Sequence, residues 1–397
     1  MLVRPRFRVV FATIAALLPV LALSGCGSAN GGSGSADGPY KLVLISDLSG
    51  AFASGSKPGA AGVEVAVGAI NDAGGVNGRK IDLEVIDGQS NPDVALAAAQ
   101  KAVASNPLAV LLFGSSAGAS KLTPLLQSAR IPFMSGAISD ESIYPPQPGL
   151  YQPGLTAKQN ADAIYQFVKQ KLKGDLAGKT VDIAAINSPF VDVVIQGASA
   201  KLEADGATIK SVERYDYGIA SFTTQAGKIA RDNPDAVLTL GADNDTIVVS
   251  KALTAAGSKA FQVGMAVAAA PEVLQQINSA NYFALTENAY ARDVPAFLAA
   301  ADKDGKKDDI LGSTFSATGW VAINILVDAL KSCDASCDGA KLNAALEQVA
   351  DFKVPGGVAY GPITFSSSDH VGASIVKFHN YDPKTDTWSE SDPITVG

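Results

Sequence analysis

Short apolar runs alternate along the chain with longer segments in which apolar residues recur every three or four positions. The runs predict strands, and the segments between them predict helices. The predicted strands cover 41–46, 81–87, 108–113, 131–135, 180–186, 207–215, 235–240 and 261–265. Alternation of strand and helix is typical of parallel sheets covered by helices on both faces. We therefore expect an α/β fold.

Two of the predicted helices can be placed in more detail. The helix expected over 59–74 puts Val63, Val67 and Ile70 on one face and ends in glycine. A later helix is expected to begin near Ser120, after a glycine-rich turn that follows the apolar run 108–113. Both helices would connect parallel strands.

The alternation runs in two blocks, which indicates two lobes. The proline- and glycine-rich stretch 144–154 separates them. We expect one lobe from 40–155 plus about 286–357, and the other from 156–285 plus about 358–397. After residue 285 we expect a long helix at 317–332. Two β-like runs follow at 361–367 and 372–382, and a hairpin is expected around 382–384.

The first residues are typical of a targeting signal. Three arginines precede an apolar run that ends in Leu-Ser-Gly-Cys, so residues 1–25 resemble a lipoprotein signal peptide and Cys26 the lipidated cysteine. An ordinary signal peptide with an incidental cysteine is the alternative. The Gly/Ser-rich residues 26–39 predict a flexible tether. We expect a protein outside the cytoplasm, anchored to the cell membrane by lipid.

Composition narrows the possible partners. Hydrophobic residues make up 47% of the chain, which is ample for a buried core. Without the three arginines of residues 1–25, 28 basic residues face 39 acidic ones, a formal charge of −11. An acidic surface argues against nucleic acid as a partner.

The two cysteines of the body, Cys333 and Cys337, are separated by three residues. Outside the cytoplasm such a pair predicts a small disulfide. A zinc site is the alternative, but no histidine lies near them in the sequence. We expect no metal, and no nucleotide-binding motif is present, so no cofactor is expected.

Four stretches together resemble a known family. In chain order they are VLISDLSGAFASGS, AINDAGGVNGRKIDLEVIDGQSNPDVALAAAQKAV, GSSAGASKLTPLLQSARIPFMSGAISDES and DAVLTLGADNDTIVVSKALTAAG. They resemble the leucine/isoleucine/valine-binding proteins, type I periplasmic binding proteins of ABC importers. The resemblance implies two Rossmann-like lobes joined by three crossovers, a small ligand in the cleft, and ABC permease and ATPase subunits as partners.

The stretch after the third predicted strand fits a ligand carboxylate. Free N–H groups at a helix start attract anions, here around Ser116 and Ala117, and Gly114 lets a ligand approach the backbone. The resemblance implies that Ser116 holds the carboxylate, with Ser139 as a second hydroxyl and Ile138 offering main-chain contact. Either serine could instead be a helix cap.

The second lobe departs from the family pattern. Around Ala266, where the resemblance implies a glutamate for the ligand's ammonium, the sequence has no acid before Glu272. Either Asp243 supplies that charge, or the ligand has no ammonium. Asp243 could equally be a helix N-cap. Phe190 replaces a tyrosine and could stack on the ligand or pack in the hinge, and Phe52 is a candidate aromatic in the first loop.

Two other functions remain open. Residues 114–118 fit G-x-S-x-G, the motif of a secreted serine hydrolase with Ser116 as nucleophile. Only His370 and His379 could complete a catalytic triad, and both lie among the β-like segments near the C-terminus, whereas a triad needs a histidine that a loop presents to the serine and an acid orients. A ligand sensor of the same fold is the second alternative. Branched-chain amino acids are the family's usual ligands, while aromatic acids or amides would suit a cleft without the acid.

Overall fold

A computed structural model describes residues 38–397. The predicted signal peptide, Cys26 and nearly all of the predicted tether lie outside the described residues. No helix of residues 38–397 is both long enough and apolar enough to cross a bilayer.

The first lobe is built on a parallel sheet in the order β2-β1-β3-β4-β5. Its strands are β1 (Tyr40–Ser46), β2 (Ile81–Asp87), β3 (Ala109–Phe113), β4 (Phe133–Ser135) and β5 (Leu150–Tyr151). Successive residues of β1 face opposite sides of this sheet, so that Leu42 and Leu44 join one core and Val43 and Ile45 join another. A strand buried on both faces explains the continuous apolar run.

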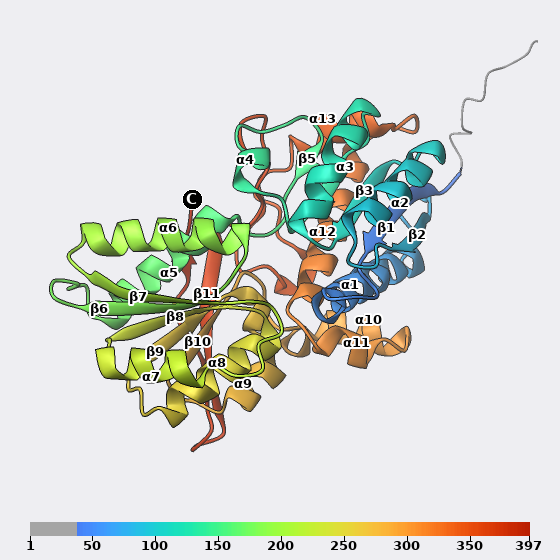
Figure 1. The fold of residues 1–397 in the computed structure, drawn as a ribbon. Coiled ribbons are helices and arrows are strands. Elements are labelled where there is room, and N and C mark those ends of the chain that lie inside the picture. The colour runs from blue at the N-terminus through green and yellow to red at the C-terminus, as the bar shows by residue number, and fades with distance from the viewer. Residues whose placement is uncertain (1–37) are drawn as a thin grey trace, which may run out of the picture. The chain divides into compact units, whose positions relative to one another are not determined.

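Helices cover both faces of the first sheet (Figure 1). On one side lie α1 (Ala53–Asp72), α10 (Pro295–Lys303), α11 (Lys307–Leu311), α12 (Phe315–Ser332) and α13 (Gly339–Leu346). On the other lie α2 (Pro92–Ala104) and α3 (Ser116–Ser128), with the short α4 (Asp140–Ile143) following β4. Residues from far along the chain thus complete the first lobe.

Glycines bring α1 and α12 into backbone contact. A Cβ added at Gly62 would stand 1.9 Å from the Ser316 carbonyl oxygen, and one added at Gly319 would stand 2.2 Å from that of Gly59. Only residues without a side chain allow this approach.

The second lobe has a mixed sheet in the order β12-β11-β10-β9-β8-β6-β7, with β13 beside β11. The strands are β6 (Thr180–Ile186), β7 (Thr208–Tyr215), β8 (Ala236–Leu240), β9 (Phe261–Gly264), β10 (Tyr282–Thr286), β11 (Ile375–Asp382), β12 (Thr387–Glu390) and β13 (Ile394–Thr395). Strands β6 to β10 are parallel, and β11 runs antiparallel to β10, β12 and β13.

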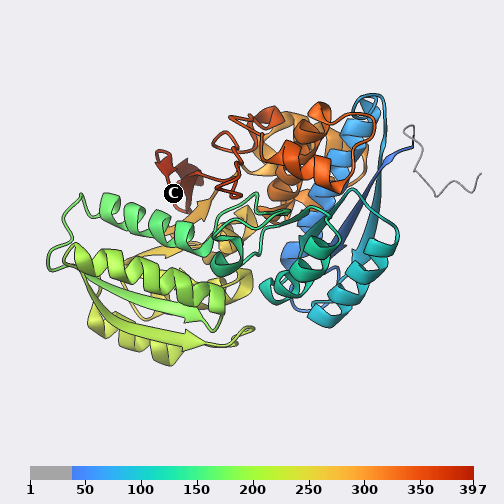
Figure 2. The same ribbon diagram turned by 90° about the horizontal axis from the view of Figure 1, so that it is seen from above.

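Two layers of helices cover this sheet (Figures 1 and 2). One layer holds α5 (Ala157–Lys171) and α6 (Pro189–Ala204); the other holds α7 (Thr223–Asp232), α8 (Asp243–Ala255) and α9 (Pro271–Ile277). The chain passes between the lobes after β5, after β10 and before β11, which makes three crossovers. The predicted fold class is therefore confirmed.

Several local predictions were wrong. Strand β10 was not predicted, and residues 361–367 form only isolated bridges such as Phe352 to Ile363 instead of a strand. Helix α1 begins at Ala53 rather than at 59, with Pro58 inside it. Tertiary contacts hold this early turn: the Phe52 N–H donates to Ser90 Oγ at 3.0 Å, and Gly55 packs beneath the Phe315 ring.

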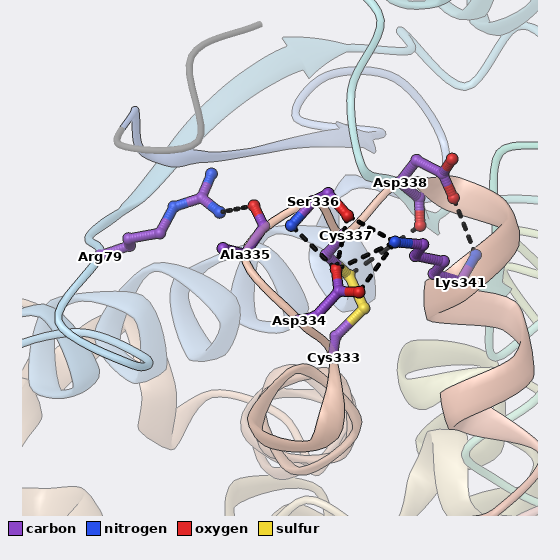
Figure 3. A network of polar contacts seen from close by, with 8 residues as sticks. All are labelled: Arg79, Cys333, Asp334, Ala335, Ser336, Cys337, Asp338 and Lys341. Atoms are coloured by element: carbon purple, nitrogen blue, oxygen red, sulfur yellow. Dashed lines mark hydrogen bonds and ion pairs between the residues drawn. A yellow bond between two sulfur atoms is a disulfide. The ribbon is translucent and has the colours of Figure 1, made fainter.

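The Cys333–Cys337 disulfide closes the turn after α12 (Figure 3). The Asp334 carboxylate accepts bonds from the Ser336 N–H and from Lys341 Nζ within this turn. The Ala335 carbonyl accepts from Arg79, whose Nε donates to the Gly38 carbonyl at 2.7 Å. The disulfide turn thus contacts Arg79, which also binds Gly38, two residues before β1.

Candidate functional site

Three loops of the first lobe lie along one edge of its sheet. Strands β1, β3 and β4 are parallel neighbours, and Ser46 pairs with Phe113 in the last register position. The segments that follow these strands carry Phe52, Ser116 and Ser139. The carboxyl edge of a parallel sheet is where open α/β folds bind ligands.

The start of α3 differs from the prediction. The helix begins at Ser116, not near Ser120, and Ser115 is its cap, with Oγ accepting the Gly118 N–H at 3.1 Å. The alternative that Ser116 is the cap is therefore wrong. Within residues 38–397 the Ser116 hydroxyl and the N–H groups of Ser116 and Ala117 have no hydrogen-bond partner. These groups are free to bind a ligand.

Ser139 occupies the N-cap position of α4, but its hydroxyl makes no cap bond. It lies 2.9 Å from the Ser142 hydroxyl, so each can serve as the other's donor. The Ile138 side chain is buried in the core beneath them. A hydroxyl pair of this kind can still donate one hydrogen to a ligand.

Sequence reasoning missed Asp47, the residue directly after β1. Its buried carboxylate fills the space beside Gly114, where a Cβ would stand 2.9 Å from an oxygen of Asp47. Burial raises the pKa of Asp47 above its usual value and Asp87 adds to that, while the amides of Ser90 and Ser115 lower it. Because Gly114 has no side chain, the Asp47 carboxylate fits beside it, just before the start of α3.

The second lobe presents a matching edge. Strands β9, β8 and β6 are parallel neighbours, with Leu240 paired to Ala185 and Thr239 to Gly264. Phe190, Asp243 and Ala266 follow their carboxyl ends. These three candidate residues therefore lie in adjacent loops.

Asp243 is the first residue of α8, and its cap position is held by Ala242. No side chain caps this helix, so the alternative that Asp243 is the N-cap is wrong. Burial is the main cause that raises the pKa of Asp243 to about 6, and nearby Asp245 adds to it. No cation among the described residues pairs with it. A ligand ammonium would find an uncompensated acid here.

The other two second-lobe candidates have partners within the protein. Phe190 packs against the core under α5 and α6, and part of its ring stays accessible. Ala266 begins a short 3-10 helix, and its carbonyl accepts the Thr314 hydroxyl at 3.0 Å. Thr314 precedes α12, so this bond joins the two lobes.

A second contact between the lobes involves two aromatic residues. The Tyr217 hydroxyl, in the loop after β7, donates to the Ala51 carbonyl at 2.9 Å. The rings of Tyr217 and Phe52 lie 6.2 Å apart at their centroids. Tyr217 was not predicted, although it follows a predicted strand just as Ser116 and Asp243 do.

The crossover after β10 carries another unpredicted acid. A Cβ added at Gly154 would stand 2.8 Å from Oε1 of Glu287, which places this carboxylate against the crossover after β5. Burial is the largest effect and raises the pKa of Glu287 to about 7, although the Thr318 side chain and its own amide lower it. Because β10 was not predicted, the sequence offered no signal for Glu287.

Both histidines have partners away from Ser116. Nδ1 of His370 lies 2.9 Å from the Leu150 carbonyl oxygen, and its Nε2 lies 3.8 Å from Glu347. Nε2 of His379 contacts the Tyr360 hydroxyl at 2.7 Å. Within residues 38–397 no group of three or more His, Cys, Asp and Glu residues could hold a metal ion.

Two α/β lobes joined by three crossovers, with contacts that involve loops at the carboxyl edges of both sheets, are the architecture of a two-lobed binding protein. The model of the periplasmic binding protein family matches residues 39–382. The chain belongs to that family, as the four stretches had indicated.

Relatives agree with this assignment. The chain is 28% identical over 246 residues to the Leu/Ile/Val-binding protein homolog 4 of Brucella abortus strain 2308. The alignment covers 58% of this chain and 57% of the relative. The chain thus spans little more than half the length of the curated relatives it matches.

Solved structures share the fold. A branched-chain amino acid ABC transporter protein from Thermus thermophilus with bound valine matches with a TM-score of 0.81 and 19% identity, covering 91% of this chain and 97% of that one. LivJ from Streptococcus pneumoniae, in complex with isoleucine, matches with a TM-score of 0.75 and 19% identity, covering 90% of this chain and 99% of that one. A fatty acid ABC transporter substrate-binding protein from Thermomonospora curvata matches with a TM-score of 0.74 and 20% identity, covering 90% of this chain and 94% of that one.

Proposed function

We propose that the protein is an extracytoplasmic substrate-binding lipoprotein of an ABC importer. It would capture a branched-chain amino acid or a related small carboxylate between its lobes and deliver it to a permease and its ATPase. Lipid on Cys26 would anchor it to the cell membrane. The proposal keeps the lobe boundaries at 40–155 plus about 286–357, and 156–285 plus about 358–397.

The observation that carries this proposal is that free donors lie at the carboxyl edge of one lobe's sheet and an acid without a cation partner lies at the carboxyl edge of the other's. The N–H groups and hydroxyl at the start of α3 suit a ligand carboxylate, and Asp243 at the start of α8 suits an ammonium. Ser139, Ile138 and Gly114 would complete the carboxylate side, and Phe190, Phe52 and Ala266 would line the apolar part. The names of the Brucella, Thermus and Streptococcus relatives support an amino acid.

Asp47 bears on the charge of the ligand. Its carboxylate lies behind Gly114, so a ligand carboxylate at Ser116 would meet a second acid close by. Two carboxylates in one site raise each other's pKa. We propose that Asp47 takes up a proton when an anionic ligand binds, which would make binding weaken as pH rises.

A second candidate ligand is an acid without an amine. The absence of an acid at Ala266 and the aromatic pair of Phe52 and Tyr217 favour an apolar or aromatic acid, and the fold is shared with the fatty acid ABC transporter substrate-binding protein from Thermomonospora curvata. An amide is a further option, and a sensor of the same fold would use the same site.

We propose binding rather than hydrolysis, because neither histidine contacts Ser116.

A thermal-shift screen distinguishes the two ligands. Leucine, isoleucine and valine would be compared with their deaminated acids and with aromatic acids, each at about 100 times its Kd, where binding adds about 2.7 kcal/mol of stability. Asp243→Asn should abolish the shift with amino acids only, while the exposed Asp192→Asn control should leave it unchanged. No shift with any of these carboxylates would contradict the proposal.

A further inference from the structure

The contact between Tyr217 and the first lobe joins loops at the two ligand-binding edges. Tyr217 follows β7, and Ala51 and Phe52 follow β1. Both rings are exposed, Phe52 by 44% and Tyr217 by 49%, and they are two of the three large apolar side chains so exposed in residues 38–397. Exposed apolar side chains that gather at one place mark an interaction site more often than scattered ones do.

Each half of this contact is held rigidly by its own lobe. On the second lobe, the buried Asp245 carboxylate accepts the N–H groups of Gly218 and Ile219 at 3.0 and 3.1 Å. Asp245 lies in the first turn of α8, two residues after Asp243. The position of Tyr217 is therefore tied to the helix start that carries the candidate ligand-binding acid.

The first-lobe half is held in the same way. The Asp87 carboxylate accepts the Leu48 N–H at 3.0 Å and the Ser49 hydroxyl at 2.7 Å. Ser90 Oγ accepts the Phe52 N–H at 3.0 Å and donates to the Ser49 carbonyl at 2.9 Å. The loop that carries the Ala51 carbonyl is thus held by hydrogen bonds within the first lobe.

We propose that Tyr217 and Phe52 form a latch that holds the lobes closed and slows release of the ligand. Tyr217 is a positioning residue: its hydroxyl bonds to the Ala51 carbonyl and its ring pairs with Phe52, so closure gains a hydrogen bond and an aromatic contact. Both contacts are made within the protein, so the latch shifts the open–closed equilibrium whichever ligand is bound. The effect on release rests on the proposed function, whereas the effect on closure does not.

The closure effect is tested on the ligand-free protein with Tyr217→Phe, which removes only the hydroxyl. The matched control is Tyr165→Phe, whose hydroxyl donates to Asp205 at 2.6 Å within the second lobe. Small-angle X-ray scattering should show a larger radius of gyration for Tyr217→Phe, with the open-to-closed ratio raised about fivefold, as expected for loss of one hydrogen bond. Amide exchange of residues 50–56 and 216–222 should accelerate in parallel, and Tyr165→Phe should match the wild type.

Unchanged scattering and exchange in Tyr217→Phe would overturn the latch. Phe52→Leu provides a second variant, which should also open the protein, because it keeps an apolar side chain but loses the ring pair. Once a ligand is identified, Tyr217→Phe should release it about fivefold faster in stopped-flow experiments, with an unchanged association rate. Equal release rates together with altered closure would overturn the role in release alone. A failure to find any ligand would count against the proposed function and leave the closure test intact.

Discussion

Glu287 and Gly154 lie in contact where two of the crossovers between the lobes pass each other. A Cβ at Gly154 would stand 2.8 Å from Oε1 of Glu287, so the carboxylate occupies the space that a side chain would need. No cation among residues 38–397 forms a salt bridge with Glu287. The hinge therefore contains a partly buried acid whose charge no cation compensates.

Glu287 should make stability depend on pH. Its pKa is raised from 4.5 to about 7 in the folded state, so the folded protein binds this proton more tightly than the unfolded chain. Stability should therefore fall as pH rises from about 4.5 to about 7, and the loss is complete above that range. Glu287→Gln should be more stable than the wild type at pH 8, because it carries no charge there. We expect a gain of only about 1–2 kcal/mol in the free energy of unfolding, because the side chain keeps some solvent contact, which weakens the effect of burial.

Urea unfolding at pH 5 and pH 8 measures this difference. The advantage of Glu287→Gln should shrink at pH 5, where the wild-type carboxyl is protonated in the folded state. Glu203→Gln, on the exposed face of α6, is the control and should follow the wild type at both values. An equal advantage at both pH values would show that packing, not charge, sets the effect.

The neighbouring serines Ser115 and Ser116 should separate stability from binding. Ser115→Ala removes the cap of α3 and should lower the free energy of unfolding by about 1 kcal/mol. Ser116→Ala removes a hydroxyl without a protein partner, so it should leave stability unchanged and weaken ligand binding. Urea unfolding and isothermal titration calorimetry measure the two effects, and a loss of stability without a loss of binding in Ser116→Ala would argue against its proposed role.

Gly62 should tolerate no side chain. Its added Cβ would stand 1.9 Å from the Ser316 carbonyl oxygen, so Gly62→Ala must push α1 away from α12. We expect a loss of about 3 kcal/mol in the free energy of unfolding, measured with urea. Gly312 ends α11 with an ordinary backbone angle and open space around it, so Gly312→Ala should leave stability unchanged or raise it by about 0.5 kcal/mol.

The disulfide should stabilise its surroundings more than the whole protein. Replacing Cys333 and Cys337 together by serine opens a short loop, which corresponds to about 2 kcal/mol in the chain-entropy model. Amide exchange should accelerate in residues 333–341 and around Arg79, which contacts Ala335. Ser336→Ala keeps the disulfide but removes the hydroxyl that bonds to Asp334 and Lys341; equal exchange in both variants would mean that these polar contacts hold the turn as much as the disulfide does.

The repeated elements of this fold could be predicted because they are local patterns. The runs containing Leu42 to Ile45 and Leu111 to Phe113 are buried on both sides, so they read as strands without reference to the rest of the chain. Strand β10 was missed although it has as many residues as β3 and β8; its place in the sheet is set by pairing with β9 and β11 on either side. The early start of α1 was missed for a similar reason, since Ser90 and Phe315 hold the turn before Pro58.

The candidate site divides in the same way. By itself, the sequence determined the α/β class, the family, and the positions after strands that carry Ser116, Asp243 and Ala266, because the ends of buried strands are encoded by neighbouring residues. Only the tertiary structure decided that Ser115 rather than Ser116 caps α3, that Asp47 lies behind Gly114, and that Tyr217 and Glu287 contact the other segments near the cleft and hinge. These relationships join residues from 67 to 166 positions apart, or depend on which of two adjacent hydroxyls turns toward an amide, and no local pattern specifies such contacts.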